Sequence, residues 1–148
     1  MASDPNCPYC AGPGGRTVWA DDSCRVVLIE DSAFAGLSRV VWNDHVRELS
    51  DLSDIDRNRL MGVVAATESS IRELMSPFKM NLGALGTGMP APHLHIHVVP
   101  RYPDDTHFPD PIWAAAKRDA GGPKLPEGFA GKLSEQLNRR LGQGKPLN

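Results

Sequence analysis

Three of the five histidines in this 148-residue chain alternate along one short segment, PHLHIHVVP. Successive side chains of a β-strand point to opposite faces, so this spacing places His93, His95 and His97 together on one face. The residues between them are apolar and would face the other way. Imidazole has a pKa of about 6.5, so at pH 7 it is largely neutral and can act as a nucleophile, a base or a metal ligand. The segment therefore predicts chemistry on one face of a strand.

A single metal ion cannot bind all three histidines of a straight strand. The outer two Cα atoms lie about 13 Å apart, whereas zinc needs its ligand nitrogens at about 2.0 to 2.1 Å. Two adjacent histidines could share an ion, as in the His-x-His sites of cupin-like barrels, which usually add a glutamate a few residues later. The first acidic residue after His95 is Asp104, beyond Pro100 and Pro103. The spacing favours divided roles for the histidines, with a catalytic metal pair as the alternative.

Two cysteines near the amino terminus form a second candidate site. Cys7 and Cys10 stand in the segment DPNCPYC, and in a reducing compartment a CxxC pair is more often a metal or redox site than a structural disulfide. A redox site needs its first cysteine at the start of a helix that follows a strand, because the helix dipole lowers the thiol pKa. Here no strand signal precedes the pair, and AGPGG, which cannot open a helix, follows it. Three interpretations remain open at this point: a metal clip, a redox pair, or two unpaired thiols.

The composition is that of an ordinary globular domain. Hydrophobic residues make up 41% of the chain and charged residues 23%, and a chain of this length can bury a single core without a disulfide or metal. The formal net charge of -2 gives no global attraction to nucleic acid or to an anionic membrane. The first residues lack a basic region followed by an apolar run, and no later run approaches the roughly 20 apolar residues of a membrane span. We therefore expect a cytoplasmic protein.

Strand and helix patterns supply the framework for these residues. Leucine, isoleucine and valine recur every three to four residues between Asp54 and Met75, which predicts one long helix with Ser53 as N-cap and Pro77 as stop. β-branched and apolar runs elsewhere predict five strands, the first two joined as a hairpin. The expected strands cover residues 17–21, 24–30, 37–42, 79–85 and 93–101.

The order of these elements predicts an α+β fold with a five-stranded, mainly antiparallel sheet and one long helix. We expect a single domain over residues 1–148 with a core of about 7–101. Residues 102–148 would contain a Pro-rich arm, RYPDDTHFPDPIW, and then a short amphipathic helix. The helix is indicated by apolar residues that recur every four positions, at Phe129, Leu133, Leu137 and Leu141.

The segment HLHIHVV resembles the signature of the histidine triad (HIT) superfamily of nucleotide hydrolases and transferases. The resemblance extends from about Cys7 to Arg101 and includes the order of hairpin, strand, long helix and two final strands. The chain looks most like the bacterial HIT hydrolases, which act on diadenosine polyphosphates and nucleoside phosphoramidates. The resemblance implies a HIT-like fold and cleavage of a phosphoanhydride or phosphoramidate bond at the α-phosphate.

In that family the middle histidine is the nucleophile, which here is His95. Neutral imidazole can attack an α-phosphorus without a separate base, and the resemblance implies that a backbone carbonyl holds its other, protonated ring nitrogen. A covalent nucleotidyl-histidine would form, and water would release the nucleoside monophosphate. His97 would contact the phosphate or the leaving-group oxygen, and no catalytic metal would be required.

Several bacterial HIT proteins that resemble this chain carry an amino-terminal CxxC pair. In them, zinc is also bound by the first histidine of the triad and by a histidine just after the third strand. The corresponding residues here are Cys7, Cys10, His93 and His45. The resemblance therefore implies a closed, structural Cys₂His₂ zinc site that ties the amino terminus to the catalytic strand, and it favours the metal clip.

Further nucleotide contacts are implied by the resemblance. Asp31 falls where the family places an acid on the ribose hydroxyls, Asn81 matches a strand asparagine, and Thr87 could donate to the phosphate together with neighbouring backbone N–H groups. Arg101 is interpreted as an exposed arginine, with a phosphate contact as the alternative. Trp113, in the Pro-rich arm, is expected to pack onto a partner subunit, with closure over a substrate as the alternative.

The chain departs from the family in the loop before the third strand. Leu37 stands where most relatives have a histidine near the nucleophile, so a nucleotide-binding relative with little or no turnover is the alternative function. HIT proteins of this type usually pair through the long helix and the sheet edge near KMNLG. We therefore expect a homodimer with a nucleotide as its small-molecule partner and without nucleic-acid or membrane partners.

Overall fold

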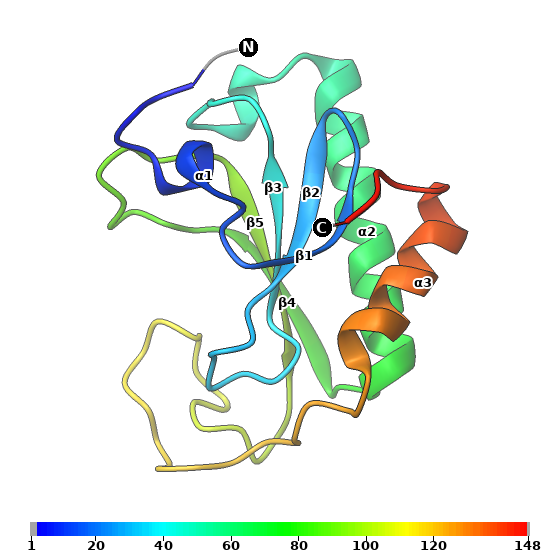
Figure 1. Ribbon diagram of the computed structural model, residues 1–148. Coiled ribbons are helices and arrows are strands. Elements are labelled where there is room, and N and C mark those ends of the chain that lie inside the picture. The colour runs from blue at the N-terminus through cyan, green and yellow to red at the C-terminus, as the bar shows by residue number, and fades with distance from the viewer. Residues whose placement is uncertain (1–2, 148) are drawn as a thin grey trace.

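The computed structural model describes residues 3–147, so residues 1, 2 and 148 of the expected domain lie outside the described part of the chain. One sheet has the strand order β1-β2-β3-β5-β4, and every neighbouring pair is antiparallel (Figure 1). The predicted α+β fold with a five-stranded antiparallel sheet is confirmed. The strands are β1 Arg16–Ala20, β2 Cys24–Leu28, β3 Ser38–Trp42, β4 Lys79–Ala84 and β5 His95–Arg101.

The long helix α2 spans Asp54–Met75, as the sequence predicts. The Ser53 hydroxyl caps its first turn by accepting a hydrogen bond from the backbone N–H of Asp56 at 3.2 Å. The helix ends at Ser76, which adopts a left-handed conformation just before Pro77. The remaining helices are α1 Pro8–Ala11, the 3₁₀ turn η1 Leu49–Asp51 and α3 Phe129–Leu141. No helix within residues 3–147 is long and apolar enough to cross a membrane.

Helices α2 and α3 lie on one side of the sheet and α1 lies on the other (Figure 1). The main core fills the space under α2 and α3, and the apolar residues that alternate with the histidines, Leu94, Ile96 and Val98, belong to it. Helix α3 adds Phe129, Leu133 and Leu137, all of which are fully buried. The hydrophobic core therefore extends beyond residue 101, because the apolar face of α3 joins the cluster under α2.

The segment between β5 and α3, residues 102–128, is called the arm here, and Asp105 organises it. Its carboxylate accepts hydrogen bonds from Nε and Nη2 of Arg101 at 2.8 and 3.1 Å. It also accepts from the backbone N–H groups of Tyr102, His107 and Phe108 at 3.0, 3.0 and 2.7 Å. The interpretation of Arg101 as an exposed residue is wrong, because its side chain is 4% exposed and ion-paired.

We predict that Asp105→Asn lowers the free energy of unfolding by about 3 to 5 kcal/mol, because the change leaves Arg101 buried without its counter-charge. The five donors hold the pKa of Asp105 at about 2, below its ordinary value of about 3.9. A carboxyl with a depressed folded pKa stabilises the protein above its ordinary pKa, and this stabilisation is lost as the pH falls through the folded pKa. The gap between wild type and variant should therefore be constant near neutrality and close between about pH 4 and pH 2.

Chemical denaturation at a series of pH values measures both effects. Asp104→Asn is the matched control, because Asp104 is the neighbouring carboxylate and is exposed. An Asp105→Asn protein as stable as this control at pH 7 would contradict the organising role of Asp105.

Candidate active site and metal centre

The sheet face opposite α2 and α3 carries the candidate site. His95 and His97 lie on β5, and β3 pairs with β5 so that Arg39 is directly opposite His97. Residues opposite each other in an antiparallel pair point to the same face, so Arg39 shares the face of the two histidines. His93 lies just before β5, which begins at His95. In this preceding segment the backbone N–H of Leu94 donates to the carbonyl of Val46 at 2.8 Å, outside the ladder of β5.

Cys7, Cys10, His45 and His93 meet at one end of this face. One ligand atom from each lies within 4.8 Å of the others. Nδ1 of His93 is 3.3 Å from Sγ of Cys7, 3.6 Å from Sγ of Cys10 and 3.2 Å from Nδ1 of His45. Sγ of Cys10 is 3.4 Å from Nδ1 of His45. The structure thus brings together all four residues that the sequence predicts as metal ligands.

The four separations that involve Nδ1 of His93 or Nδ1 of His45, 3.2 to 3.6 Å, are close to those of a tetrahedral zinc site. A zinc ion with nitrogen at about 2.0 to 2.1 Å and sulfur at about 2.3 Å would separate its ligand atoms by about 3.3 to 3.8 Å. The ring of His93 is already oriented for binding, because its Nε2–H donates to the carbonyl of Trp42 at 2.5 Å and leaves the Nδ1 lone pair toward the cluster. The two cysteines and two histidines therefore fit a structural zinc site.

The geometry disfavours the other two interpretations of the cysteine pair. Cys7 is 1% exposed, whereas a redox cysteine must be reached by the disulfide or thiol with which it exchanges. AGPGG opens no helix, but one helical turn, Pro8–Ala11, precedes it, and in this turn the carbonyl of Cys7 accepts from the N–H groups of Cys10 and Ala11. Pro8 occupies the first position of this turn, where proline is favoured. The turn places both sulfurs toward the two histidines.

His95 is held by the residue two positions before it. Its Nδ1 lies 2.7 Å from the carbonyl oxygen of His93, so Nδ1 carries the proton and donates it. Nε2 then has a free lone pair on the open side of the ring. Gly86 approaches that side so closely that a Cβ atom there would lie 2.6 Å from Cε1 and 3.2 Å from Nε2 of His95. With a φ of +96°, position 86 requires glycine for both reasons.

His95 opens into a cavity of about 310 Å³, called here the catalytic cavity. Tyr9, from the turn between the two cysteines, packs against His95 with ring centroids 4.7 Å apart. The Tyr9 hydroxyl accepts a hydrogen bond from Nη1 of Arg39 at 2.8 Å. The cavity is lined by Pro8, Tyr9, Gly14, Arg39, Gly86, Met89, His95 and His97.

The electrostatics of the catalytic cavity keep its histidines neutral. Burial, followed by the charges of Arg39 and His95, lowers the pKa of His97 to about 4. Burial also lowers the pKa of His95; the hydrogen bond to the backbone of His93 opposes this effect, and the charge of Arg39 adds to it. Within residues 3–147, two buried side-chain polar atoms lack a hydrogen-bond partner, Nε of Arg39 and Nδ1 of His97. Both belong to residues that line this cavity, and buried polar groups normally have partners.

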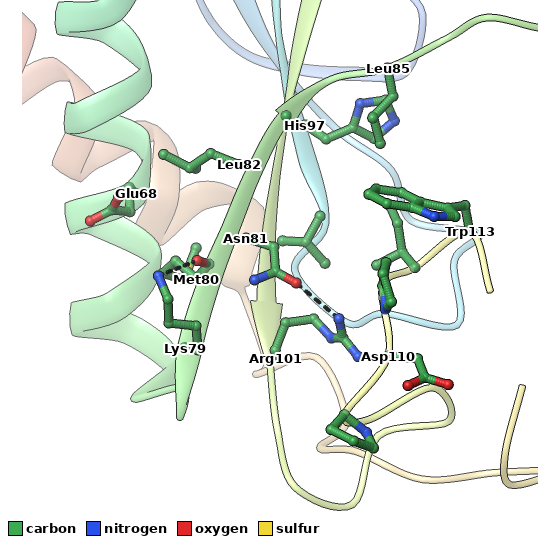
Figure 2. A pocket seen from close by; sticks show the side chains of 15 residues that line it. Glu68, Lys79, Met80, Asn81, Leu82, Leu85, His97, Arg101, Asp110 and Trp113 are labelled. Carbon is green, nitrogen blue, oxygen red and sulfur yellow. Dashed lines mark hydrogen bonds between the residues drawn. The ribbon is translucent and has the colours of Figure 1, made fainter.

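A second and larger cavity, about 590 Å³, lies on the other side of His97 and is called here the arm cavity. Its walls come from β4, β5 and the arm, and Figure 2 places His97, Leu85 and Trp113 at the same end of it. Asn81 and Arg101 form another part of the wall and are joined by a 2.9 Å hydrogen bond from Nη1 of Arg101 to Oδ1 of Asn81. Asn81, predicted as a nucleotide contact, therefore lies in the arm cavity.

The other predicted residues lie farther from His95. Thr87 is exposed and lines neither cavity, although its neighbour Gly86 abuts the ring. Asp31 is exposed in the turn after β2 and also lines neither cavity, so its ribose contact stays a prediction. Leu37 packs in an apolar cluster with Phe34 and Val99. Arg39 and Tyr9 were missed by the sequence analysis, although a lone arginine within the apolar run of β3 was a signal that could have been read.

The family model of the HIT domain matches residues 15–104. Among solved structures, a histidine triad protein from Marinobacter aquaeolei VT8 has a TM-score of 0.64 at 26% identity, over 87% of this chain and 90% of that chain. A zinc-bound histidine triad family protein from Mycobacterium smegmatis has a TM-score of 0.58 at 18% identity, over 90% of this chain and 94% of that chain. At this identity the second likeness shows the fold alone.

A curated relative is the AP-4-A phosphorylase of Mycobacterium tuberculosis, which is 40% identical over 73 residues. The match covers 47% of this chain and 37% of the relative. The chain therefore spans well under half the length of this relative.

We predict that the protein purified without chelator contains about one zinc ion per chain, as a closed Cys₂His₂ site does. Cys10→Ser should lower the zinc content and the melting temperature together, because the site would lose a ligand. Metal analysis by mass spectrometry and thermal unfolding measure the two effects. Cys24→Ala is the control for zinc content, because the Cys24 thiol is outside the cluster. Full zinc content in Cys10→Ser would refute the assignment.

Proposed function

Because the chain belongs to the HIT domain family, we propose that it cleaves a phosphoanhydride or phosphoramidate bond at the α-phosphate of a nucleotide, with His95 as the nucleophile. The proposed substrates are dinucleoside polyphosphates or nucleoside phosphoramidates. One observation carries the proposal: Nδ1 of His95 donates to the carbonyl of His93 at 2.7 Å, which leaves Nε2 free in the catalytic cavity. This is the tautomer that an attacking imidazole needs.

The proposed reaction has two steps. The lone pair on Nε2 of His95 attacks the α-phosphorus, the bond to the bridging oxygen or nitrogen breaks, and the leaving group keeps the electron pair and takes up a proton. Water then attacks the nucleotidyl-histidine and releases a proton to solvent, which balances the proton that the leaving group takes from solvent, and the phosphorus–nitrogen bond breaks with its electron pair returning to Nε2. The products are the nucleoside monophosphate, the protonated leaving group and neutral His95.

Arg39 and His97 would bind the charge of the reacting phosphate. Both residues line the cavity that His95 enters, and Arg39 is held in position by the Tyr9 hydroxyl at 2.8 Å. Negative charge on the phosphate oxygens increases as the nucleophile attacks, so preorganised donors stabilise the transition state more than the substrate. The backbone at Gly86, which abuts His95, would approach the phosphate from the loop side.

The zinc cluster would have a structural role in this mechanism. Zinc bound there holds Cys7, Cys10, His45 and His93 in a closed site, and none of the four lines the catalytic cavity. His93 would position His95 through its carbonyl oxygen.

Two alternatives concern what happens at His95. The similarity to AP-4-A phosphorylase over 73 residues makes inorganic phosphate a second candidate acceptor in place of water. Phosphate attack on the nucleotidyl-histidine would release a nucleoside diphosphate. The second alternative is binding without turnover, which the leucine at position 37 suggests. The expected homodimer stays a prediction; β4 is an edge strand of the sheet and Leu82 on it is 46% exposed, which leaves an edge available for pairing.

We predict that the wild type converts diadenosine tetraphosphate to adenosine monophosphate and adenosine triphosphate, and that His95→Ala lowers the rate by at least about 10³-fold, as loss of a covalent nucleophile does. Products are measured by mass spectrometry with and without inorganic phosphate and with and without brief chelation. Appearance of adenosine diphosphate only when phosphate is added would identify phosphorolysis. Brief chelation should not change the rate, because the proposed chemistry uses no metal.

The matched control is His107→Ala, which removes the one histidine outside both cavities and the metal cluster. A rate that is the same in wild type and His95→Ala would exclude His95 as the nucleophile. Binding of adenosine monophosphate without turnover of either substrate class would favour the binding-only alternative.

We further predict that Arg39→Met lowers kcat/KM by about 10²-fold, the usual cost of losing one charge-stabilising donor. The positive charge of Arg39 disfavours a second cation on His97, so its removal should raise the pKa of His97 above about 4. Arg39→Lys keeps the charge and should keep this pKa low. Titration of the His97 imidazole by NMR measures the shift, and an unchanged His97 pKa in Arg39→Met would refute the electrostatic coupling.

A further inference from the structure

The four candidate zinc ligands come from three segments of the chain. Cys7 and Cys10 belong to the amino-terminal segment around α1, His45 lies in the segment after β3, and His93 lies just before β5. The ring of His93 is already held by the carbonyl of Trp42, the last residue of β3, at 2.5 Å. The amino-terminal segment and the segment after β3 therefore need a contact of their own if the ligands are to meet before an ion binds.

Arg25, on β2, contacts both of these segments. In the amino-terminal segment, its Nη2 donates to the carbonyls of Tyr9 at 2.8 Å and Gly12 at 3.2 Å. Its Nε donates to the carbonyl of Pro13 at 2.9 Å. In the segment after β3, its Nη1 donates to Oδ1 of Asn43 at 2.8 Å. A guanidinium has five N–H donors in a rigid planar fork, so one side chain can bind two segments at once.

The contacts of Arg25 with the amino-terminal segment satisfy backbone groups that α1 leaves open. A helix cannot pair its last carbonyls internally, and α1 is a single turn. Arginine side chains near the end of a helix can donate to such carbonyls. The same turn packs on the sheet, because Cys7 and Tyr9 share a buried apolar cluster with Val27 and Val41. Both kinds of contact hold the turn on the face of the sheet that carries the cluster.

Asn43, the other partner of Arg25, is itself held in place. Its Nδ2 donates to the carbonyls of Asp21 and Asp22 at 3.1 and 3.2 Å, in the turn between β1 and β2. This orients Oδ1 toward Arg25. Asn43 stands two residues before His45, so the segment that carries His45 is joined to the same guanidinium as the turn that carries the cysteines.

We propose that Arg25 is a positioning residue that joins the amino-terminal segment to the segment after β3 before an ion binds, and so preforms the metal cluster. None of its four hydrogen bonds uses a ligand atom, so these bonds do not require zinc. Ligands that are already in place lose less conformational entropy on binding. Loss of an outer contact of this kind usually lowers metal affinity by about 10- to 100-fold.

The same contacts reach the catalytic cavity through Tyr9. Its carbonyl accepts from Arg25 and its hydroxyl accepts from Arg39, both at 2.8 Å. Tyr9 lines the catalytic cavity and packs against His95. The wall beside His95 therefore has a support besides the ion, which is a physical reason for activity to survive brief chelation.

Zinc affinity, measured by competition with a chromophoric chelator, tests the proposal. We expect Arg25→Met to raise the zinc dissociation constant by about 10- to 100-fold. Arg25→Lys keeps the charge but presents a single nitrogen, which cannot span four acceptors, so its zinc affinity should stay well below that of the wild type. Arg118→Met is the matched control, because Arg118 also donates to backbone carbonyls, those of Asp105 and Phe108, but does so in the arm. Its zinc affinity should equal that of the wild type, even where its melting temperature falls.

These affinities separate a positioning role from the alternatives. An Arg25→Met protein that binds zinc as tightly as the wild type would overturn the proposal alone. Full affinity in Arg25→Lys would mean that charge suffices and would overturn the role of the hydrogen bonds. An equal loss of affinity in Arg118→Met would mean that lost stability, and not position, weakens binding. A wild type that binds no zinc would overturn the proposal together with the zinc assignment.

A second measurement decides the proposal even if Arg25→Met does not fold. In the wild type stripped of zinc, NMR should still show nuclear Overhauser contacts between the rings of Tyr9 and His95, which are 4.7 Å apart. The Nε–H of Arg25 should exchange with solvent more slowly than that of Arg16, whose side chain is 57% exposed. Loss of the ring contacts, or equal exchange of the two arginines, would show that the turn is released without the ion and would overturn the proposal.

Discussion

His93 is the one residue that contacts both the metal cluster and His95, the proposed nucleophile. Its Nε2–H is fixed by the carbonyl of Trp42 at 2.5 Å, which turns Nδ1 toward Cys7 and Cys10. Its own carbonyl accepts the Nδ1 proton of His95 at 2.7 Å. An ion held by four ligands restricts the position of His93, and the same residue selects the tautomer of His95. The orientation of His95, the proposed nucleophile, therefore depends on a cluster none of whose four residues lines the catalytic cavity.

A second connection runs through Tyr9, which stands between the two cysteines. Its ring packs 4.7 Å from that of His95, and its hydroxyl accepts from Arg39 at 2.8 Å. Binding of Cys7 and Cys10 to zinc fixes both ends of the segment Cys7–Cys10 and so restricts the ring of Tyr9. Arg39 is therefore held in place before a phosphate binds. Preorganisation of this kind removes a cost that would otherwise be met during the reaction. The amino-terminal clip thus contributes Pro8 and Tyr9 to the wall of the proposed active site.

The periodicity of the sequence predicted the helices and strands, because both have fixed repeats. Helix α2 begins after its predicted N-cap and ends before Pro77. The alternation of residues in β5 placed His95 and His97 on one face. The partners of these residues depend on tertiary register. Cys7 and His93 are separated by 86 positions, and only the resemblance to a family brought them together. Arg39 could equally have been a solvated arginine until pairing of β3 with β5 put it opposite His97. The arm has no repeat, because the hydrogen bonds of Asp105 define its shape.

Position 37 holds an apolar leucine, but the same strand region still provides a polar side chain, that of Arg39, to the cavity that contains His95. Leu37 lies just before β3 and packs with Phe34 and Val99, whereas Arg39, two residues later, reaches the catalytic cavity. Residues two apart in an extended chain share a face, so a polar group at position 39 acts on the same surface one step closer to the centre of β3. Burial, and after it the charge of Arg39, lowers the pKa of His97 and so favours its neutral form. The half-buried guanidinium of Arg39 has Tyr9 as its recorded hydrogen-bond partner within residues 3–147, which leaves donors available to an anion in the cavity.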